Sequence, residues 1–412
     1  MFIEPTIRDG MDHVHMLVDT IGKRPTGFAG ERRAAAYLCE QLASWGLEDV
    51  GTEPFEARSW DFDACRLESG SMEPLEGLPI EFSGSTGAGG VEGELLVYED
   101  PGDVRTEELA GKIVLVHGGM PADEVLLEGR PLAFILVTGN RRAWHLIYGP
   151  QRPLAGKLPM LTLGLDDGVE LIRRGVRRLR LVLQTTIEDV EGLNVVGSLP
   201  ATGGTAERRL NISSHYDSVP AGGAAADNAA GVACALEVVH ALAQDPPDVV
   251  VDVALFSAEE IGLYGSEAYS LQHAQQLQRT ELGIYFDGQG DFLGRHEILA
   301  MGTPGLADYV GTRCRDLGYR ADIQLGFNGV DTAFLGARGA PTLWFTRGPA
   351  PAWHTRADIS ADISAQALRE SIYTAVQIAR DVAAHPERFE QGIPEDQMRQ
   401  IQDYVAGGAP VW

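Results

Sequence analysis

The sequence has 412 residues, of which 59 are Asp or Glu and 33 are Lys or Arg, so its formal charge is −26 with His neutral. This charge argues against a nucleic-acid-binding protein, because such proteins neutralise phosphates with a basic surface. With 44% hydrophobic and 22% charged residues, the composition is that of a globular protein and excludes a mainly disordered chain. The length predicts about two or three domains.

The sequence carries no membrane or disulfide signal. It has no stretch of about 18 or more uninterrupted apolar residues, so we expect no transmembrane helix and no membrane partner. The first residues lack a basic-then-apolar signal pattern, which predicts a cytoplasmic protein; secretion stays open if a leader has been removed. The 4 Cys lie far apart without a CxxC pair, which supports neither a disulfide scaffold nor a zinc finger. The basic run at residues 171–180 is interpreted as a solvated face.

Two amphipathic helices are predicted near the N-terminus, at residues 8–22 and 30–46. In the second helix, apolar residues recur every three or four positions and Gly46 ends the pattern. Between residues 55 and 185 the pattern changes to short apolar runs bounded by Gly, Pro and Asp, which is typical of strands. We therefore predict that residues 55–185 form a separate, strand-rich inserted domain.

From Leu193 onward, apolar strands alternate with helices. The expected strands lie at 192–200, 209–217, 249–257, 282–288 and 341–346, and the expected helices at 228–243, 264–277 and 361–384. Continuous Val, Ile and Leu runs spaced by helices predict an α/β fold with a mostly parallel central sheet flanked by helices on both faces. This discontinuous domain would comprise residues 1–54 and 186–390, and residues 391–412 would be a C-terminal tail.

Ionisable residues follow the predicted strands at the point where each strand ends. In open α/β sheets, sites lie at the carboxyl ends of strands, so these residues are candidates. They are His215, Asp217, Glu259, Glu260, Asp287 and His354, joined by Asp227 in a Gly/Ala-rich loop before a helix. Each has a structural alternative: a His after a strand is often a core residue, and Asp227 would suit a helix cap. The acids that follow fully apolar strands are harder to explain, because charge is costly there unless it is used.

Two His with several carboxylates form the mixed nitrogen and oxygen ligand set that suits zinc. Two metal ions a few Å apart need one bridging carboxylate. Asp227 is the natural bridge, because its loop of small residues allows close backbone approach. Adjacent Glu259 and Glu260 point in different directions, so we expect one to be a ligand and the other a general base.

The order of these residues resembles the M28 family of zinc aminopeptidases. The family pattern is an HxD, a DN with a Gly three residues on, an EE followed by G and GS, a strand-ending D, and a late HT with D downstream. The matching residues are His215-Tyr216-Asp217, Asp227-Asn228 with Gly231, Glu259-Glu260 with Gly262, Gly265 and Ser266, Asp287, and His354-Thr355 with Asp358. The sequence departs from the family in having DNAAG where DNxSG is usual, which touches no expected ligand.

The resemblance implies two Zn²⁺ per chain that share one ligand. The expected sets are His215, Asp227 and Asp287 for one ion, and Asp227, Glu260 and His354 for the other.

The resemblance also implies roles for the neighbouring residues. Glu259 would be the general base, and Asp217 and Asp358 would orient the two His ligands. Asp331 matches a further family segment, in which its role is structural. The inserted domain resembles the protease-associated insert of some members, chiefly through GKIVLV at residues 111–116.

The implied function is hydrolysis of a peptide or amide bond, most often by an aminopeptidase that removes N-terminal residues from peptides. A carboxypeptidase, a glutaminyl cyclase, a small-molecule amidohydrolase or a non-catalytic receptor-like homologue would share the scaffold. The M20 peptidases share the HxDxxP opening, but they insert a lid between their metal ligands. Only 66 residues (354 − 287 − 1) separate Asp287 from His354, and they contain elements of the main sheet, which favours M28. We expect a monomer or homodimer.

Overall fold

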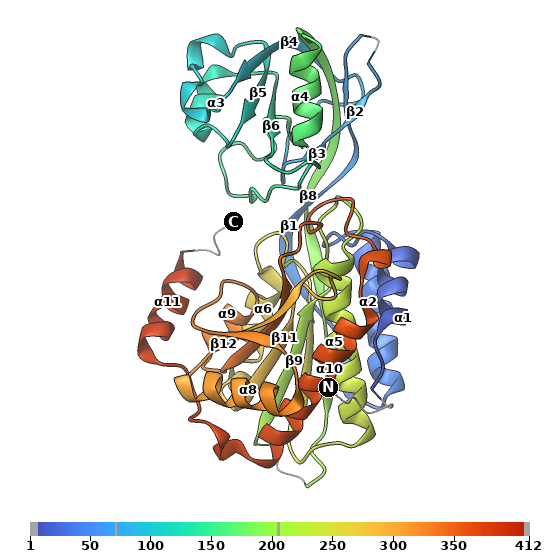
Figure 1. Cartoon of the computed structure of the whole chain (residues 1–412), viewed down its shortest axis with the longest axis vertical. Helices are drawn as coiled ribbons and strands as arrows, with labels where there is room; N and C mark the ends of the chain where they lie inside the picture. The colour runs from blue at the N-terminus through green and yellow to red at the C-terminus, as the bar shows by residue number, and fades with distance from the viewer. Residues whose placement is uncertain (1–6, 71, 204–206, 408–412) are drawn as a thin grey trace. The chain divides into compact units, whose positions relative to one another are not determined.

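The computed structural model describes residues 7–70, 72–203 and 207–407. The chain divides into two compact units (Figure 1). Among the described residues, unit 1 contains residues 7–57, Glu191–Ser218 and residues 222–407, and unit 2 contains Arg58–Val190 with Val219–Ala221. Two long strands, β1 (Glu48–Glu68) and β8 (Arg178–Leu199), run from one unit into the other. Within the described residues, no helix has the length and apolar character needed to cross a bilayer.

The sheet of unit 1 has the strand order β13-β12-β14-β11-β9-β10-β8. Its central strands are mutually parallel: β14 (Thr342–Gly348), β11 (Thr280–Phe286), β9 (Arg209–His215) and β10 (Val250–Phe256). Antiparallel neighbours flank them, namely β8 beside β10 and β12 (Arg295–Met301) beside β14, with β13 (Ala321–Leu325) parallel to β12 at the edge. The predicted α/β fold with a mostly parallel sheet is confirmed.

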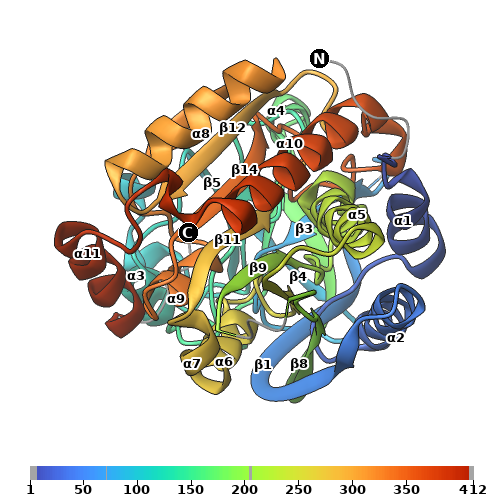
Figure 2. The same cartoon turned by 90° about the horizontal axis from the view of Figure 1, so that it is seen from below.

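Helices cover both faces of this sheet (Figure 2). One face carries α1 (Met11–His15), the π-helix η1 (Met16–Ile21), α2 (Ala29–Ser44), α5 (Ala230–Gln244), α8 (Pro304–Leu317) and α10 (Ala365–Ala384). The other carries α6 (Tyr264–Gln272), α7 (Ala274–Leu277), α9 (Thr332–Gly336) and α11 (Glu395–Ala406). Successive side chains of a strand point to opposite faces, so Val253 and Leu255 pack under the first layer while Ala254 and Phe256 pack under the second. Burial on both sides explains the continuous apolar runs.

The C-terminal segment differs from the prediction of a separate tail. It belongs to unit 1 and forms α11, in which Ile401 is fully buried. The Gln397 side-chain amide accepts a hydrogen bond from the Gly302 N–H and donates one to the Gly302 carbonyl. Gln397 and Ile401, four residues apart, are the two buried residues of this helix. Met398, Ile401 and Val405 recur at intervals of three and four residues, so the sequence does contain an amphipathic signal for this helix.

Unit 2 is built on parallel strands in the order β4 (Val91–Tyr98), β5 (Lys112–His117), β6 (Ala133–Val137) and β7 (Met160–Leu163). The short β3 (Leu78–Pro79) pairs antiparallel with β7, and β2 (Leu75–Glu76) pairs with β1. Helices α3 (Asp123–Gly129) and α4 (Leu165–Arg173) pack through Leu126 and Leu171 into two different apolar clusters. The basic run lies on α4 and β8, where its Arg side chains pair with Glu170, Glu92 and Glu68.

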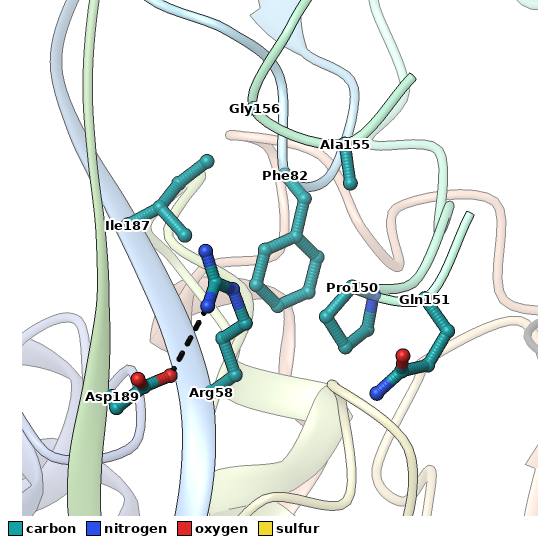
Figure 3. Close-up of a pocket in the computed structure, with 8 residues that line it drawn as sticks. All are labelled: Arg58, Phe82, Pro150, Gln151, Ala155, Gly156, Ile187 and Asp189. Carbon is teal, nitrogen blue, oxygen red and sulfur yellow. Dashed lines mark hydrogen bonds and ion pairs between the residues drawn. The ribbon is translucent and has the colours of Figure 1, made fainter. Parts of the chain in front are cut away.

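Unit 2 also contains a hollow of about 330 Å³ (Figure 3). Arg58 of β1 and Asp189 of β8 lie on its wall with Nη1 and Oδ1 3.3 Å apart, beside Phe82, Pro150 and Ile187. The two charged side chains are 53% and 82% exposed. Their ion pair therefore contributes little to stability.

Replacing Gly30 at the start of α2 tests the packing of this helix. A Cβ there would lie 1.9 Å from the Lys23 carbonyl oxygen, a backbone atom that cannot turn aside. We expect Gly30→Ala to lower the free energy of unfolding by about 1–3 kcal/mol. The matched control is Gly51→Ala in β1, where the added Cβ meets nothing within 4 Å. Thermal unfolding measures both variants, and equal melting temperatures would contradict the prediction.

Candidate metal centre

The candidate residues lie at one edge of the unit 1 sheet because its central strands end there together. The register pairs Phe256 of β10 with His215 of β9, and Phe286 of β11 with both Ser214 and Phe345. Asp287 follows β11 directly, Glu259 and Glu260 follow β10, and His354 lies in the loop after β14. Asp227 lies in η4 (Ala225–Ala229), the irregular turn that leads into α5.

The structure places these side chains in two clusters that share Asp227. In one cluster His215 Nε2 lies 3.3 Å from Asp227 Oδ1 and 3.3 Å from Asp287 Oδ1. In the other, His354 Nε2 lies 3.2 Å from Asp227 Oδ2 and 3.2 Å from Glu260 Oε2. Within each cluster the three candidate ligand atoms lie within 4.8 Å of one another. The two oxygens of Asp227 thus face two different His side chains, as a bridging carboxylate requires.

Burial and close contacts between charged groups shift the pKa values of the cluster. Burial opposes the charged form of Asp227, but hydrogen bonds with His215 and His354 are stronger and lower the pKa of this carboxyl. Burial also opposes protonation of the two His, yet the surrounding carboxylates raise both His pKa values well above normal. Burial raises the pKa of Glu260 to about 7 and that of Glu259 well above its usual range. The site therefore concentrates negative charge that the protein alone neutralises poorly.

Asp217 contacts both His215 and the backbone of the acidic pair. One oxygen lies 3.4 Å from His215 Nδ1, and its carboxylate accepts hydrogen bonds from the backbone N–H groups of Glu259 and Glu260. It therefore holds the His ring and the backbone of the acidic pair in one arrangement.

Asp358 contacts the backbone of the loop that carries Asp227. Its carboxylate accepts hydrogen bonds from the backbone N–H groups of Ala226 and Asp227, at 2.7 and 3.1 Å. Burial has the largest effect on the Asp358 carboxyl and raises its pKa to about 7. Asp358 therefore positions the loop that carries Asp227. A sequence motif contains no information on which backbone amides a distant carboxylate will meet.

Asn228 and Gly231 explain the DN and Gly positions of the motif. The Asn228 side-chain amide donates to Ser214 Oγ and to the carbonyls of His215 and Phe286, and its oxygen accepts from the Gly288 N–H. Asn228 thus ties together the ends of β9 and β11. A Cβ on Gly231 would lie 2.0 Å from Asn228 Oδ1, so a larger residue there would push this amide away.

Three further residues interact with the site. The sequence indicated a structural role for Asp331 and no role for Tyr404 or Arg24. Asp331 is fully buried and accepts a hydrogen bond from Tyr285 Oη; burial raises its pKa to about 7. Tyr404 of α11 donates to the Gly329 carbonyl, and burial and the Glu259 and Asp331 carboxylates raise its pKa. Arg24 is completely buried. The aromatic and basic residues lie far from every motif in sequence, so no spacing signals them.

The donor set fits zinc. Both clusters combine one imidazole nitrogen with carboxylate oxygens, a mixture typical of catalytic zinc. The carboxylates are buried, which is costly without positive charge nearby. Metal ions would supply that charge.

Comparison with known proteins agrees with this geometry. The family model described as Peptidase family M28 matches residues 194–379. This part of the chain belongs to peptidase family M28. The match contains all five candidate ligands and Glu259, so the resemblance drawn from the motifs is confirmed.

The relatives of this chain include proteins named as aminopeptidases and proteins named as carboxypeptidases. A probable lipoprotein aminopeptidase, LpqL of Mycobacterium tuberculosis, is 26% identical over 79% of this chain and 66% of the relative. Carboxypeptidase Q of Xenopus laevis is 24% identical over 71% of this chain and 69% of the relative. The chain thus spans about two thirds of the length of these curated relatives.

Solved structures share the fold. A zinc aminopeptidase from Bacillus subtilis superposes with a TM-score of 0.73 at 21% identity, covering 94% of this chain and 99% of the other. A peptidase M28 precursor from Shewanella amazonensis gives a TM-score of 0.78 at 20% identity, covering 94% and 95% of the two chains. The matched share of the chain includes residues of both units, so these structures resemble it in fold well beyond residues 194–379.

Removal of the shared carboxylate tests the metal centre. Because Asp227 contributes one oxygen to each cluster, we expect Asp227→Ala to lose most of the metal that the wild type binds. Metal analysis of purified protein after dialysis against zinc-free buffer measures the change. The control is Asp316→Ala, which removes an exposed carboxylate on α8 and is expected to leave metal content unchanged. Two tightly bound ions in Asp227→Ala would refute the bridge.

Proposed function

We propose that this protein is a di-zinc aminopeptidase. The observation that carries the proposal is the position of Asp227, whose two oxygens face the His ligands of two separate clusters. His215, Asp227 and Asp287 would hold one ion, and Asp227, Glu260 and His354 the other. When bound, zinc polarises a substrate carbonyl and lowers the pKa of a water molecule from 15.7 to about 7.

The chain's own residues would move the proton. Glu259 follows β10 and precedes the candidate ligand Glu260, and it belongs to neither ligand cluster. Its raised pKa makes the carboxylate a stronger base than an exposed Glu. Glu259 would accept a proton from the attacking water and return it to the nitrogen of the leaving amine. Asp217 would keep Glu259 in place through its backbone hydrogen bond.

A carboxypeptidase is the second candidate. Carboxypeptidase Q from Xenopus laevis resembles the chain about as closely as the aminopeptidase relatives do. The metal ligands and the base act on the scissile bond, so they do not decide which end of a peptide is recognised. A non-catalytic homologue is less consistent with a site in which every ligand and the base are present.

Paired substrates separate these activities. We expect hydrolysis of an aminoacyl p-nitroanilide with a free amino group and none of its N-acetylated counterpart. A zinc chelator should abolish the activity, and added zinc should restore it. Cleavage of an N-blocked peptide with a free carboxylate, with the free-amine substrate left intact, would identify a carboxypeptidase instead.

Replacement of the base separates chemistry from metal binding. We expect Glu259→Gln to retain the wild-type zinc content, because Glu259 belongs to neither ligand cluster. Turnover should fall by about 10²-fold or more, because the variant cannot accept the proton. Zinc analysis and kcat on the same preparation provide the test. Wild-type turnover in Glu259→Gln would eliminate Glu259 as the base.

A further inference from the structure

Arg24 has an environment that the proposed reaction does not explain. Among the described residues it is the one Arg or Lys side chain in the buried class, with 0% exposure. A buried guanidinium is costly unless its charge is compensated. Arg24 lies in the connector between η1 and α2, far in sequence from every metal ligand.

The hydrogen bonds of the guanidinium go to backbone carbonyls. Nε donates to the Tyr216 oxygen at 2.7 Å, Nη1 to the Leu17 and Gly22 oxygens at 3.0 and 2.9 Å, and Nη2 to the Ala224 oxygen at 3.3 Å. All of these partners are neutral. Arg24 is therefore held rigidly, but its charge is not consumed by a direct ion pair.

The compensating charges belong to the metal centre. Burial lowers the pKa of Arg24 to about 10, and the carboxylates of Asp217, Asp358, Glu260 and Asp227 oppose this effect. The side chain therefore stays charged at neutral pH. Two of its carbonyl partners, Tyr216 and Ala224, come one residue before Asp217 and three residues before Asp227. The guanidinium is thus held against the backbone that leads into both carboxylates.

We propose that Arg24 is a permanent counter-ion of the metal centre, which stabilises the buried carboxylates when zinc is absent and weakens zinc binding when it is present. The proposal rests on the zinc site of the proposed function. Both effects follow from Coulomb's law, because a positive charge attracts the carboxylates and repels a cation bound to them. Such a residue would keep the zinc-free protein folded and set an upper limit on zinc affinity.

A purely structural tether would behave differently. If Arg24 only held the loop through its carbonyl contacts, its loss would destabilise the zinc-free and the zinc-loaded protein alike, or would disorder the ligands and weaken zinc binding. If it is a counter-ion, its loss destabilises the zinc-free protein more. By thermodynamic linkage, zinc then binds the variant more tightly than it binds the wild type.

The experiment compares Arg24→Gln, Arg24→Lys and the wild type with and without zinc. We expect Arg24→Gln to lower the melting temperature of the zinc-free protein by about 5 °C or more and that of the zinc-loaded protein by less. Its zinc dissociation constant, measured by competition with a chromophoric chelator, should fall by about tenfold or more. Arg24→Lys keeps the charge and loses hydrogen bonds, so its zinc affinity should stay within about twofold of the wild type.

Arg33→Gln is the matched control. Arg33 also donates to a nearby backbone carbonyl, that of Ile21, but its side chain is exposed on α2. We expect the same zinc affinity as the wild type in this variant.

The outcomes separate the two roles. If Arg24→Gln loses equal stability with and without zinc, or binds zinc more weakly than the wild type, the counter-ion proposal is overturned. If Arg24→Gln does not fold without zinc, refolding on zinc addition supports the proposal and failure to refold overturns it. If the wild type binds no zinc, the proposed function fails. The counter-ion proposal is then tested by the melting temperatures of the zinc-free proteins, and it requires Arg24→Lys to be more stable than Arg24→Gln.

Discussion

The constraint on which this structure depends is the burial of several carboxylates at one edge of a sheet. Asp217, Asp227, Glu260 and Asp287 all lie in the buried class, where an unpaired charge is strongly unfavourable. Basic side chains offset this cost: His215 and His354 lie within 3.3 Å of the carboxylates, and the buried Arg24 guanidinium is the proposed counter-ion. These groups leave an excess of negative charge that fits divalent cations, so the chemistry and the stability of the site have one cause.

The fold makes this concentration of charge possible. Four parallel strands end at the same level, and each places the residues that follow it at the shared edge. Asn228 and Asp358 then fix the backbone between the strand ends with hydrogen bonds to main-chain groups. Helices on both faces exclude water from the strands beneath, as Val253 and Phe256 show on opposite sides. The ligands are therefore held by the rigid part of the protein.

Much of the fold and the site was predictable because its signals are local. Continuous apolar runs identified the central strands, and acids directly after those runs identified Glu259, Glu260 and Asp287. Two residues show where local signals end, because neither acts through its neighbours in sequence alone. Asp358 accepts hydrogen bonds from the backbone N–H groups of Ala226 and Asp227, which lie 132 and 131 residues earlier. Arg24 belongs to no motif, and its Nε donates to the Tyr216 carbonyl, 192 residues later.

The sequence by itself determined the kind of site: an M28-type set of His and carboxylates, one of them placed to bridge, on an α/β scaffold. It could do so because metal-ligand chemistry depends on residue type and order along the chain. Only the tertiary structure decided how the charges are balanced, because Coulomb energy depends on distance and burial, and neither is written in residue spacing. The formal charge of −26 is a sum over the whole chain, whereas the charges that matter to this protein are the few that folding brings together.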